Sequence, residues 1–280
     1  MKLGVSAFAW TTEFTTAHLP LLDFVKRLGY DGLEIPVFNP AAVPARELRR
    51  GFESAGLECT VCAILPGEVN PISGDAGVRR QARGHLLRLL DLAVELGATR
   101  VGGPLYAPIG YLPARRRNED EWRWAVECFA GITHEVESRG ISLAIEPVNR
   151  AESHFLCTAA ESVKFCDAVG SPAIGILLDT FHANIEEKQV AAAMTTAGAR
   201  LMHVHMSEND RSLVGSGHID FPAVVRALAA IHYEGYLMVE GFGFSEAPEN
   251  KLGARWAEKH VSPEMIAAEG IDHLRKLLAR

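Results

Sequence analysis

The feature that most constrains the fold of this chain is an alternation of short β-rich runs with longer amphipathic segments, repeated eight times. In segment 85–94, for example, apolar residues recur every three or four positions, as on one face of a helix. Because the eight units follow one another without a linker, we predict a single (β/α)₈ TIM barrel forming one domain over residues 1–280. The β-rich runs are Lys2–Phe8, Gly32–Phe38, Cys59–Leu65, Arg100–Tyr106, Ser142–Val148, Ile174–Thr180, Leu201–Ser207 and Tyr236–Phe242.

Glycine stands where several of the predicted helices end and the next strand begins. Glycine adopts the left-handed backbone conformation at a helix end without a steric penalty, so its position marks the end of a helix. A doubly wound open sheet is the alternative fold, but no G-x-G-x-x-G motif follows a strand to support it. The helix-ending glycines are Gly29, Gly56, Gly97, Gly140 and Gly170.

Composition excludes several classes of protein. With 280 residues, 48% of them hydrophobic, the chain can bury a core. Its formal net charge of −7 disfavours sequence-blind binding to nucleic acid, which requires a basic surface. No apolar run approaches the roughly 18–20 residues of a membrane helix, and the first residues do not resemble a secretory signal. Five scattered cysteines favour a reduced, cytoplasmic protein.

Metal-competent side chains concentrate at the carboxyl ends of the last four predicted strands. One buried acid is usually satisfied by a backbone amide or an arginine, but four such residues at equivalent strand ends would meet at the mouth of one barrel. Three carboxylates there require a cation or a tight network of pairs. The long insertions after the third, fourth and eighth strands lie at the same end. The four residues are Glu146, Asp179, His205 and Glu240.

The spacing of two histidines indicates which one lies at the mouth. His203 and His205 share one face of their strand, and the deeper His203 suits a supporting or core role. Three oxygens and one imidazole favour one divalent ion such as Mn²⁺, Mg²⁺ or Co²⁺ over a closed zinc site.

Other side chains near the strand ends are candidates for contact with a ligand. Cys59 and Cys62 face opposite sides of a strand, which argues against a C-x-x-C metal or redox pair, but Cys62 could line the pocket. Trp10 and Tyr106 lie where an aromatic ring could stack on a sugar or cap the top of the barrel. His182 and Arg211 lie in loops after strands, where surface positions are common.

At these residues the chain resembles the ketose 3-epimerases, the D-tagatose and D-allulose 3-epimerase group of the xylose-isomerase-like barrels. The stretch Asp179–Glu187, D-T-F-H-x-N-I-E-E, is the most specific part of the resemblance. The likeness spans nearly the whole chain. The other matching segments are Glu146–Glu152, His203–Arg211, Val239–Glu240, Gly103–Tyr106 and Gly110–Pro113.

The resemblance implies an isomerase that epimerises C3 of free ketoses with one divalent ion, Mn²⁺ in the first instance, through a cis-enediolate. It implies that Glu146, Asp179, His205 and Glu240 bind the ion and that Glu146 and Glu240 also act as acid and base. Cys62 falls at a pocket position of the family. The residues expected at the carbonyl end of the sugar are Glu152, His182 and Arg211. We expect a homodimer or homotetramer that binds neither nucleic acid nor membrane.

Three alternatives share parts of this interpretation: another reaction in the same metal-binding barrel, a nuclease, and a subunit without catalytic activity. Aldose–ketose isomerisation, dehydration of a keto-inositol and cleavage of a 3-keto sugar all begin with proton removal beside a carbonyl, so the same residues would serve. A nuclease of the endonuclease IV type would need a richer metal cluster and a basic groove. A sugar-binding or assembly subunit with a vestigial site would bind no divalent ion.

Overall fold

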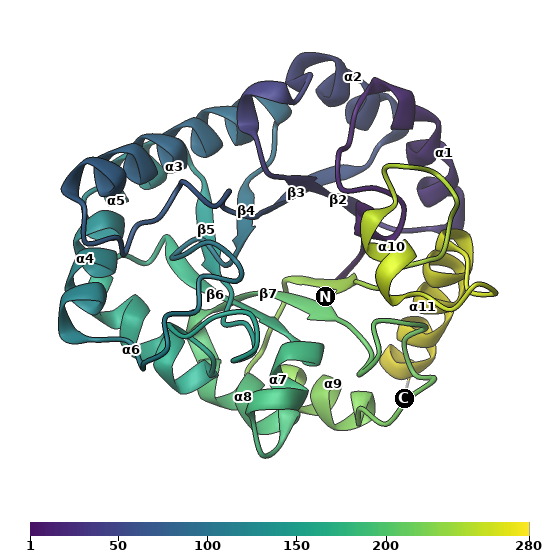
Figure 1. The fold of residues 1–280 in the computed structure, drawn as a ribbon. Coiled ribbons are helices and arrows are strands. Elements are labelled where there is room, and N and C mark those ends of the chain that lie inside the picture. The colour runs from purple at the N-terminus through teal and green to yellow at the C-terminus, as the bar shows by residue number, and fades with distance from the viewer. Residues whose placement is uncertain (280) are drawn as a thin grey trace.

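The computed structural model describes residues 1–279 as a closed barrel of eight parallel strands in the order β1 to β8, with β8 paired to β1. Figure 1 views the barrel with the helices forming a ring outside the strands. The predicted (β/α)₈ fold is therefore confirmed. The strands are β1 (Lys2–Ser6), β2 (Gly32–Val37), β3 (Glu58–Ala63), β4 (Arg100–Gly103), β5 (Ser142–Ile145), β6 (Ile174–Asp179), β7 (Leu201–Met206) and β8 (Tyr236–Val239).

The helices cover the outer face of the barrel and bury their apolar faces against it. No helix within the described residues is long and apolar enough to cross a membrane. The α-helices are α1 (Leu19–Leu28), α2 (Ala45–Ala55), α3 (Ala76–Leu96), α4 (Glu119–Ala130), α5 (Thr133–Ser138), α6 (Ala159–Val169), α7 (Thr180–Glu186), α8 (Val190–Ala197), α9 (Phe221–Ala230), α10 (Lys251–Trp256) and α11 (Pro263–Leu278). The short 3₁₀ helices are η1 (Ala7–Ala9), η2 (Thr16–His18), η3 (Pro40–Ala42) and η4 (Gly198–Arg200).

The glycine signals mark helix ends as predicted. Gly29, Gly56, Gly97 and Gly170 each cap a helix in the left-handed conformation, and Gly140 has φ +64° two residues after α5. These caps return the chain to the amino end of the next strand.

All eight β-rich runs continue beyond the strands that form, three of them by three residues. These three runs are predicted to end at Tyr106, Val148 and Phe242, whereas β4, β5 and β8 end at Gly103, Ile145 and Val239. Gly103 is the reason at β4: its φ is +126°, and a Cβ atom there would lie 2.1 Å from the Ala63 carbonyl oxygen. The chain turns away from the sheet at this point, and the loops at this rim begin.

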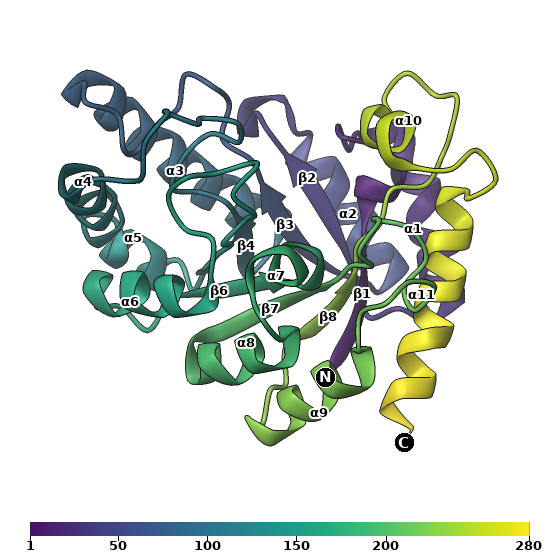
Figure 2. The same ribbon diagram turned by 60° about the horizontal axis from the view of Figure 1, so that its bottom comes forward.

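The loop after β8 rises over one side of the barrel mouth. Figure 2 shows α10 beyond the ends of β1 and β2, at the end of the molecule opposite the two termini. A small apolar cluster of Phe8, Cys62 and Phe242 packs against Leu252 of α10 at this end. The mouth therefore has an apolar wall on the α10 side.

Candidate metal centre and active site

The carboxyl ends of β5 to β8 bring the four predicted ligand residues to one place. Asp179 ends β6 and His205 lies in β7, while Glu146 and Glu240 directly follow β5 and β8. The backbone N–H groups of Glu146 and Glu240 still donate to strand neighbours, at 3.0 Å to Gly103 and 3.2 Å to Met206. The backbone of both residues is thus still held by the sheet, one residue beyond the end of each strand.

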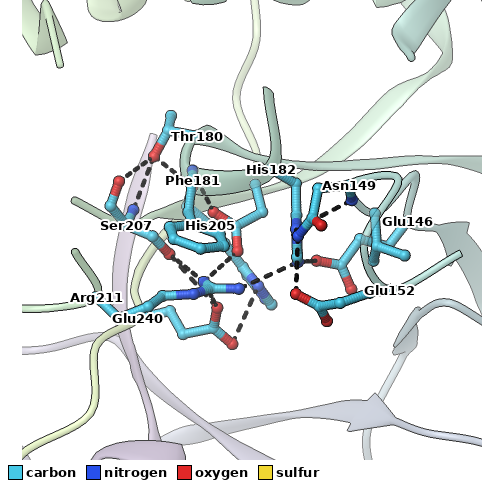
Figure 3. Close-up of polar contacts among 12 residues, drawn as sticks. Glu146, Asn149, Glu152, Thr180, Phe181, His182, His205, Ser207, Arg211 and Glu240 are labelled. Carbon is cyan, nitrogen blue, oxygen red and sulfur yellow. Dashed lines mark hydrogen bonds and ion pairs between the residues drawn. The ribbon is translucent and has the colours of Figure 1, made fainter. Parts of the chain in front are cut away.

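These side chains form two overlapping clusters that share Asp179. Asp179, His205 and Glu240 each offer a ligand atom, all within 4.8 Å of one another, and so do Glu146, Asp179 and His182. All five residues are buried. His205 Nδ1 lies 3.4 Å from Glu240 Oε1 (Figure 3). The predicted convergence of acids and an imidazole at the barrel mouth is present in the structure.

Arg211 lies within this cluster and not on the surface. Its Nη1 contacts Asp179 Oδ2, lies 2.5 Å from Glu240 Oε2 and donates to Ser207 Oγ at 3.0 Å (Figure 3). The guanidinium also lies over the ring of Phe181, 4.1 Å from its centroid. Although burial opposes the charge, Asp179 and Glu240 raise the pKa of Arg211 above its ordinary value. The side chain is therefore a fixed, buried cation.

His182, Asn149 and Glu152 form a second polar group beside the cluster. His182 Nδ1 accepts the backbone N–H of Asn149 at 3.2 Å, and Asn149 Nδ2 donates to Glu152 Oε1 at 2.7 Å (Figure 3). His182 Nε2 lies 3.8 Å from Glu146 Oε1. Burial, together with Arg211, lowers the pKa of His182 to about 3, so the ring is neutral near pH 7.

A cavity of about 660 Å³ opens above these groups. One side is polar, with Glu146, Glu152, His182, Arg211 and Glu240. The apolar part of the lining comes from distant parts of the chain: Phe8, Phe38, Cys62, Ile64, Phe242, Leu252 and Trp256. Polar groups converging on one side of a largely apolar cavity are typical of a small-molecule site. A smaller cavity of about 360 Å³ near Lys2, Glu58 and Tyr236 contains none of these residues.

Two of the predicted ligand-contact residues do not line the 660 Å³ cavity. Tyr106 is buried, and its hydroxyl donates to the Leu156 carbonyl oxygen at 3.0 Å, because the chain turns out of the barrel after Gly103. Trp10 packs against Phe24 of α1, and its Nε1 donates to Glu264 Oε1 of α11 at 3.0 Å. We therefore assign neither of them a contact with substrate.

The sequence reasoning missed Glu34, which lies in the middle of β2 and is fully enclosed by the barrel. Its carboxylate lies between His203 and His205 of β7, with Glu34 Oε2 3.0 Å from His203 Nε2 and Oε1 2.8 Å from His205 Nε2. A charged residue between Leu33 and Ile35 was the available signal, since an acid inside an apolar strand needs buried partners.

The donor set fits a divalent cation. His205 Nδ1 is buried, faces the carboxylates and has no hydrogen-bond partner among residues 1–279. Burial raises the pKa of Glu146 well above its usual range. The negative charges of Asp179 and Glu240 raise this pKa further, whereas the positive charges of His205 and Arg211 oppose the rise. A divalent ion would relieve that repulsion between carboxylates. Carboxylate oxygens with one imidazole suit a hard or intermediate metal.

The fold and this site define a class of protein, and comparison with known families agrees. Residues 22–277 match the family described as Xylose isomerase-like TIM barrel, to which the chain belongs. Within that class it belongs to the ketose 3-epimerase family, which identifies it as a ketose 3-epimerase-like isomerase and confirms the family expected from the motifs.

Individual relatives support this placement over almost the full chain. A probable ketose 3-epimerase of Synechocystis sp. is 31% identical over 99% of this chain and 96% of its own length. D-psicose 3-epimerase of Agrobacterium fabrum is 34% identical over 86% of this chain and 85% of its own. A solved structure of an L-ribulose 3-epimerase superposes with a TM-score of 0.91 at 30% identity, over 99% of this chain and 94% of the other.

Proposed function

We propose that this protein is a divalent-metal-dependent epimerase that interconverts free ketoses at C3. The observation that carries the proposal is a pair of buried ligand clusters joined at Asp179, which contain Glu146, His205 and Glu240, with Glu146 and Glu240 lining a cavity large enough for a monosaccharide. These four residues would hold the ion, with Mn²⁺ as the first candidate and Co²⁺ or Mg²⁺ as alternatives, since carboxylates with one imidazole accommodate all three. When bound, the ion would supply Lewis-acid stabilisation of the enediolate charge.

Glu146 and Glu240 are proposed as the acid–base pair. Epimerisation at C3 requires that a proton leave one face of the sugar, giving a cis-enediolate, and that another be added from the opposite face. Glu146 follows β5 and Glu240 follows β8, so the two carboxylates approach the cavity from separate parts of the rim. One takes the C3 proton while the other donates its own, and the roles exchange in the reverse direction.

The remaining polar residues are proposed to orient the sugar. Arg211, Glu152 and His182 present donors and an acceptor along one side of the cavity and would bind the O1–O2 end. Cys62, on the apolar wall with Phe8 and Phe242, would contact the carbon chain. This wall would also limit access of water to the enediolate.

A ketose screen tests this function directly. Protein stripped of metal and reloaded with Mn²⁺, Co²⁺ or Mg²⁺ is incubated with D-allulose, D-tagatose, D-fructose or L-ribulose, and products are read by NMR. We expect a C3 epimer from at least one ketose and no reaction after stripping. Parallel incubations with an aldose, a keto-inositol and a 3-keto-glucoside test the alternative reactions. The 3-keto-glucoside is included because a 3-dehydro-D-guloside 4-epimerase of Escherichia coli is 29% identical over 89% of this chain. Turnover of only these compounds would replace the proposal.

We further propose that residues 1–280 act as one domain in a cytoplasmic homodimer or homotetramer. The five cysteines are free thiols, as expected in a reducing compartment. Ile109, Tyr111 and Leu112 expose apolar surface in the loop after β4, which suits a contact between copies. Light scattering of the purified protein measures the assembly, and a monomer would contradict it.

A further inference from the structure

Glu34 is an acid at a position where TIM barrels usually have branched aliphatic side chains. It lies opposite Ser6 of β1 and Thr60 of β3 in the sheet, and its side chain is 1% exposed. An unpaired carboxylate in such a place is strongly unfavourable. The groups that contact Glu34 therefore indicate how a carboxylate is stabilised inside the barrel and what it does there.

The two oxygens of Glu34 have separate partners. Oε2 accepts the Thr60 hydroxyl at 3.3 Å and lies 3.0 Å from His203 Nε2. Oε1 lies 2.8 Å from His205 Nε2. Because the Thr60 hydroxyl donates to Oε2 and the His203 ring packs beside it, rotation of the carboxylate would lose both contacts, and Oε1 is directed at His205.

The two ring nitrogens of His205 consequently face different groups. Nε2 faces Glu34, whereas Nδ1 faces the cluster of carboxylates and lies 3.4 Å from Glu240 Oε1. The Glu34 contact has the length of a charge-assisted hydrogen bond, although the N–H direction is not aligned with Oε1 in this structure. A carboxylate at Nε2 favours the tautomer with the proton there, which leaves the lone pair on Nδ1.

We propose that Glu34 is a positioning residue that fixes the ring orientation and tautomer of His205 so that Nδ1 serves as the metal ligand. The proposal rests on the divalent-metal function proposed above. It assigns His203 and Thr60 the role of holding the carboxylate in place. In proteins, a carboxylate behind a metal-binding histidine orients the ring and increases its basicity, and its loss weakens metal binding about 10–100-fold.

The test measures metal affinity in the absence of substrate. Mn²⁺ is titrated calorimetrically into metal-free wild type, Glu34→Gln and Glu121→Gln. Glu121 is a matched control, since it is equally buried and lies 3.3 Å from His154 Nε2, but it does not line the proposed site. We expect about 10–100-fold weaker Mn²⁺ binding in Glu34→Gln and unchanged affinity in Glu121→Gln. Circular dichroism verifies that each variant is folded.

A second measurement needs no variant. ¹⁵N NMR of the histidine rings reports the tautomer of His205 in wild type loaded with diamagnetic Mg²⁺, where we expect the proton on Nε2. A proton on Nδ1, or wild-type Mn²⁺ affinity in folded Glu34→Gln, would overturn the proposal. If Glu34→Gln does not fold, Glu34→Asp, which withdraws the carboxylate by one methylene, replaces it with the same criterion. Failure of the wild type itself to bind Mn²⁺ would instead refute the proposed function.

Discussion

Arg211 Nη1 lies 2.5 Å from Glu240 Oε2, which joins the one buried arginine of the cluster to a proposed catalytic carboxylate. The same nitrogen contacts Asp179. Arg211 has φ +63°, an uncommon conformation for a residue with a side chain, and its carbonyl accepts the N–H of Phe242. The loop after β7 is thus folded so that this guanidinium reaches the floor of the cavity.

Substitution of Arg211 tests its role in holding the sugar. Arg211→Ala removes charge-assisted hydrogen bonds worth about 1.5–3 kcal/mol, so kcat/KM for the ketose should fall about 10–150-fold. Mn²⁺ should remain bound at one equivalent, measured by elemental analysis, because the proposed ligands are intact. Arg200→Ala is the control, since Arg200 pairs with Asp167 outside the cavity. Unchanged kinetics in Arg211→Ala would remove the residue from the substrate site.

Asp179 tests the assignment of the ion. Asp179→Asn removes a charge but keeps nearly the same volume, and an amide oxygen can still accept the Phe181 N–H that caps α7 at 2.8 Å. The fold should therefore persist while Mn²⁺ occupancy after dialysis falls sharply. Chelation of wild type should abolish activity in the same way, with recovery on adding Mn²⁺. Full occupancy and activity in Asp179→Asn would contradict the ligand assignment.

Gly103 ends β4 beside the proposed active site, so a substitution there tests whether the backbone conformation affects the site. In Gly103→Ala the new Cβ would lie 2.1 Å from the Ala63 carbonyl oxygen at a φ of +126°, which should cost about 3 kcal/mol of stability. Activity should fall as well, because the Gly103 carbonyl accepts the N–H of Glu146. Gly140→Ala is the control: φ is +64° but nothing lies within 4 Å, so about 1 kcal/mol is expected from urea unfolding. Equal losses would show that the close contact is unimportant.

The sequence was sufficient to predict the barrel and the convergence of acids at its rim. Parallel strands put all their carboxyl ends at one edge, so Glu146, Asp179 and Glu240 could be placed together from their positions in the β-rich runs alone. The rule fails beyond the strand ends. Tyr106 follows the turn at Gly103, where φ is +126° and the Ala63 carbonyl leaves no room for a Cβ atom, and no pattern in the sequence expresses this turn.

Glu34 and Arg211 illustrate a second limit of prediction from sequence, which concerns contacts that form only in the folded barrel. Glu34 lies on β2 and its histidine partners lie on β7, strands that are not paired in the sheet, so their contact exists only because the barrel closes. Arg211 was predicted to bind sugar from the family resemblance, but its burial depends on a loop conformation that local preference alone does not produce.

The two glutamates proposed as acid and base can be substituted one at a time. Glu146→Gln and Glu240→Gln should each lower the rate of epimerisation at least about 100-fold, since acid–base catalysis contributes roughly 10²–10⁴-fold. Because both residues are also proposed ligands, each variant is assayed at saturating Mn²⁺ with metal content measured. Loss of activity that reflects only lost metal would be recovered at high Mn²⁺, and such recovery would argue against a role in proton transfer.

The most direct test of the two-base account is hydrogen exchange at C3 by metal-loaded Glu240→Gln in deuterated water, followed by ¹H NMR of a ketose that the wild type epimerises. With Glu146 still able to remove and return a proton on its own face, the account predicts that substrate or its epimer, whichever presents C3–H to Glu146, gains deuterium at C3 without inversion. Epimerisation by this variant at the wild-type rate would contradict it.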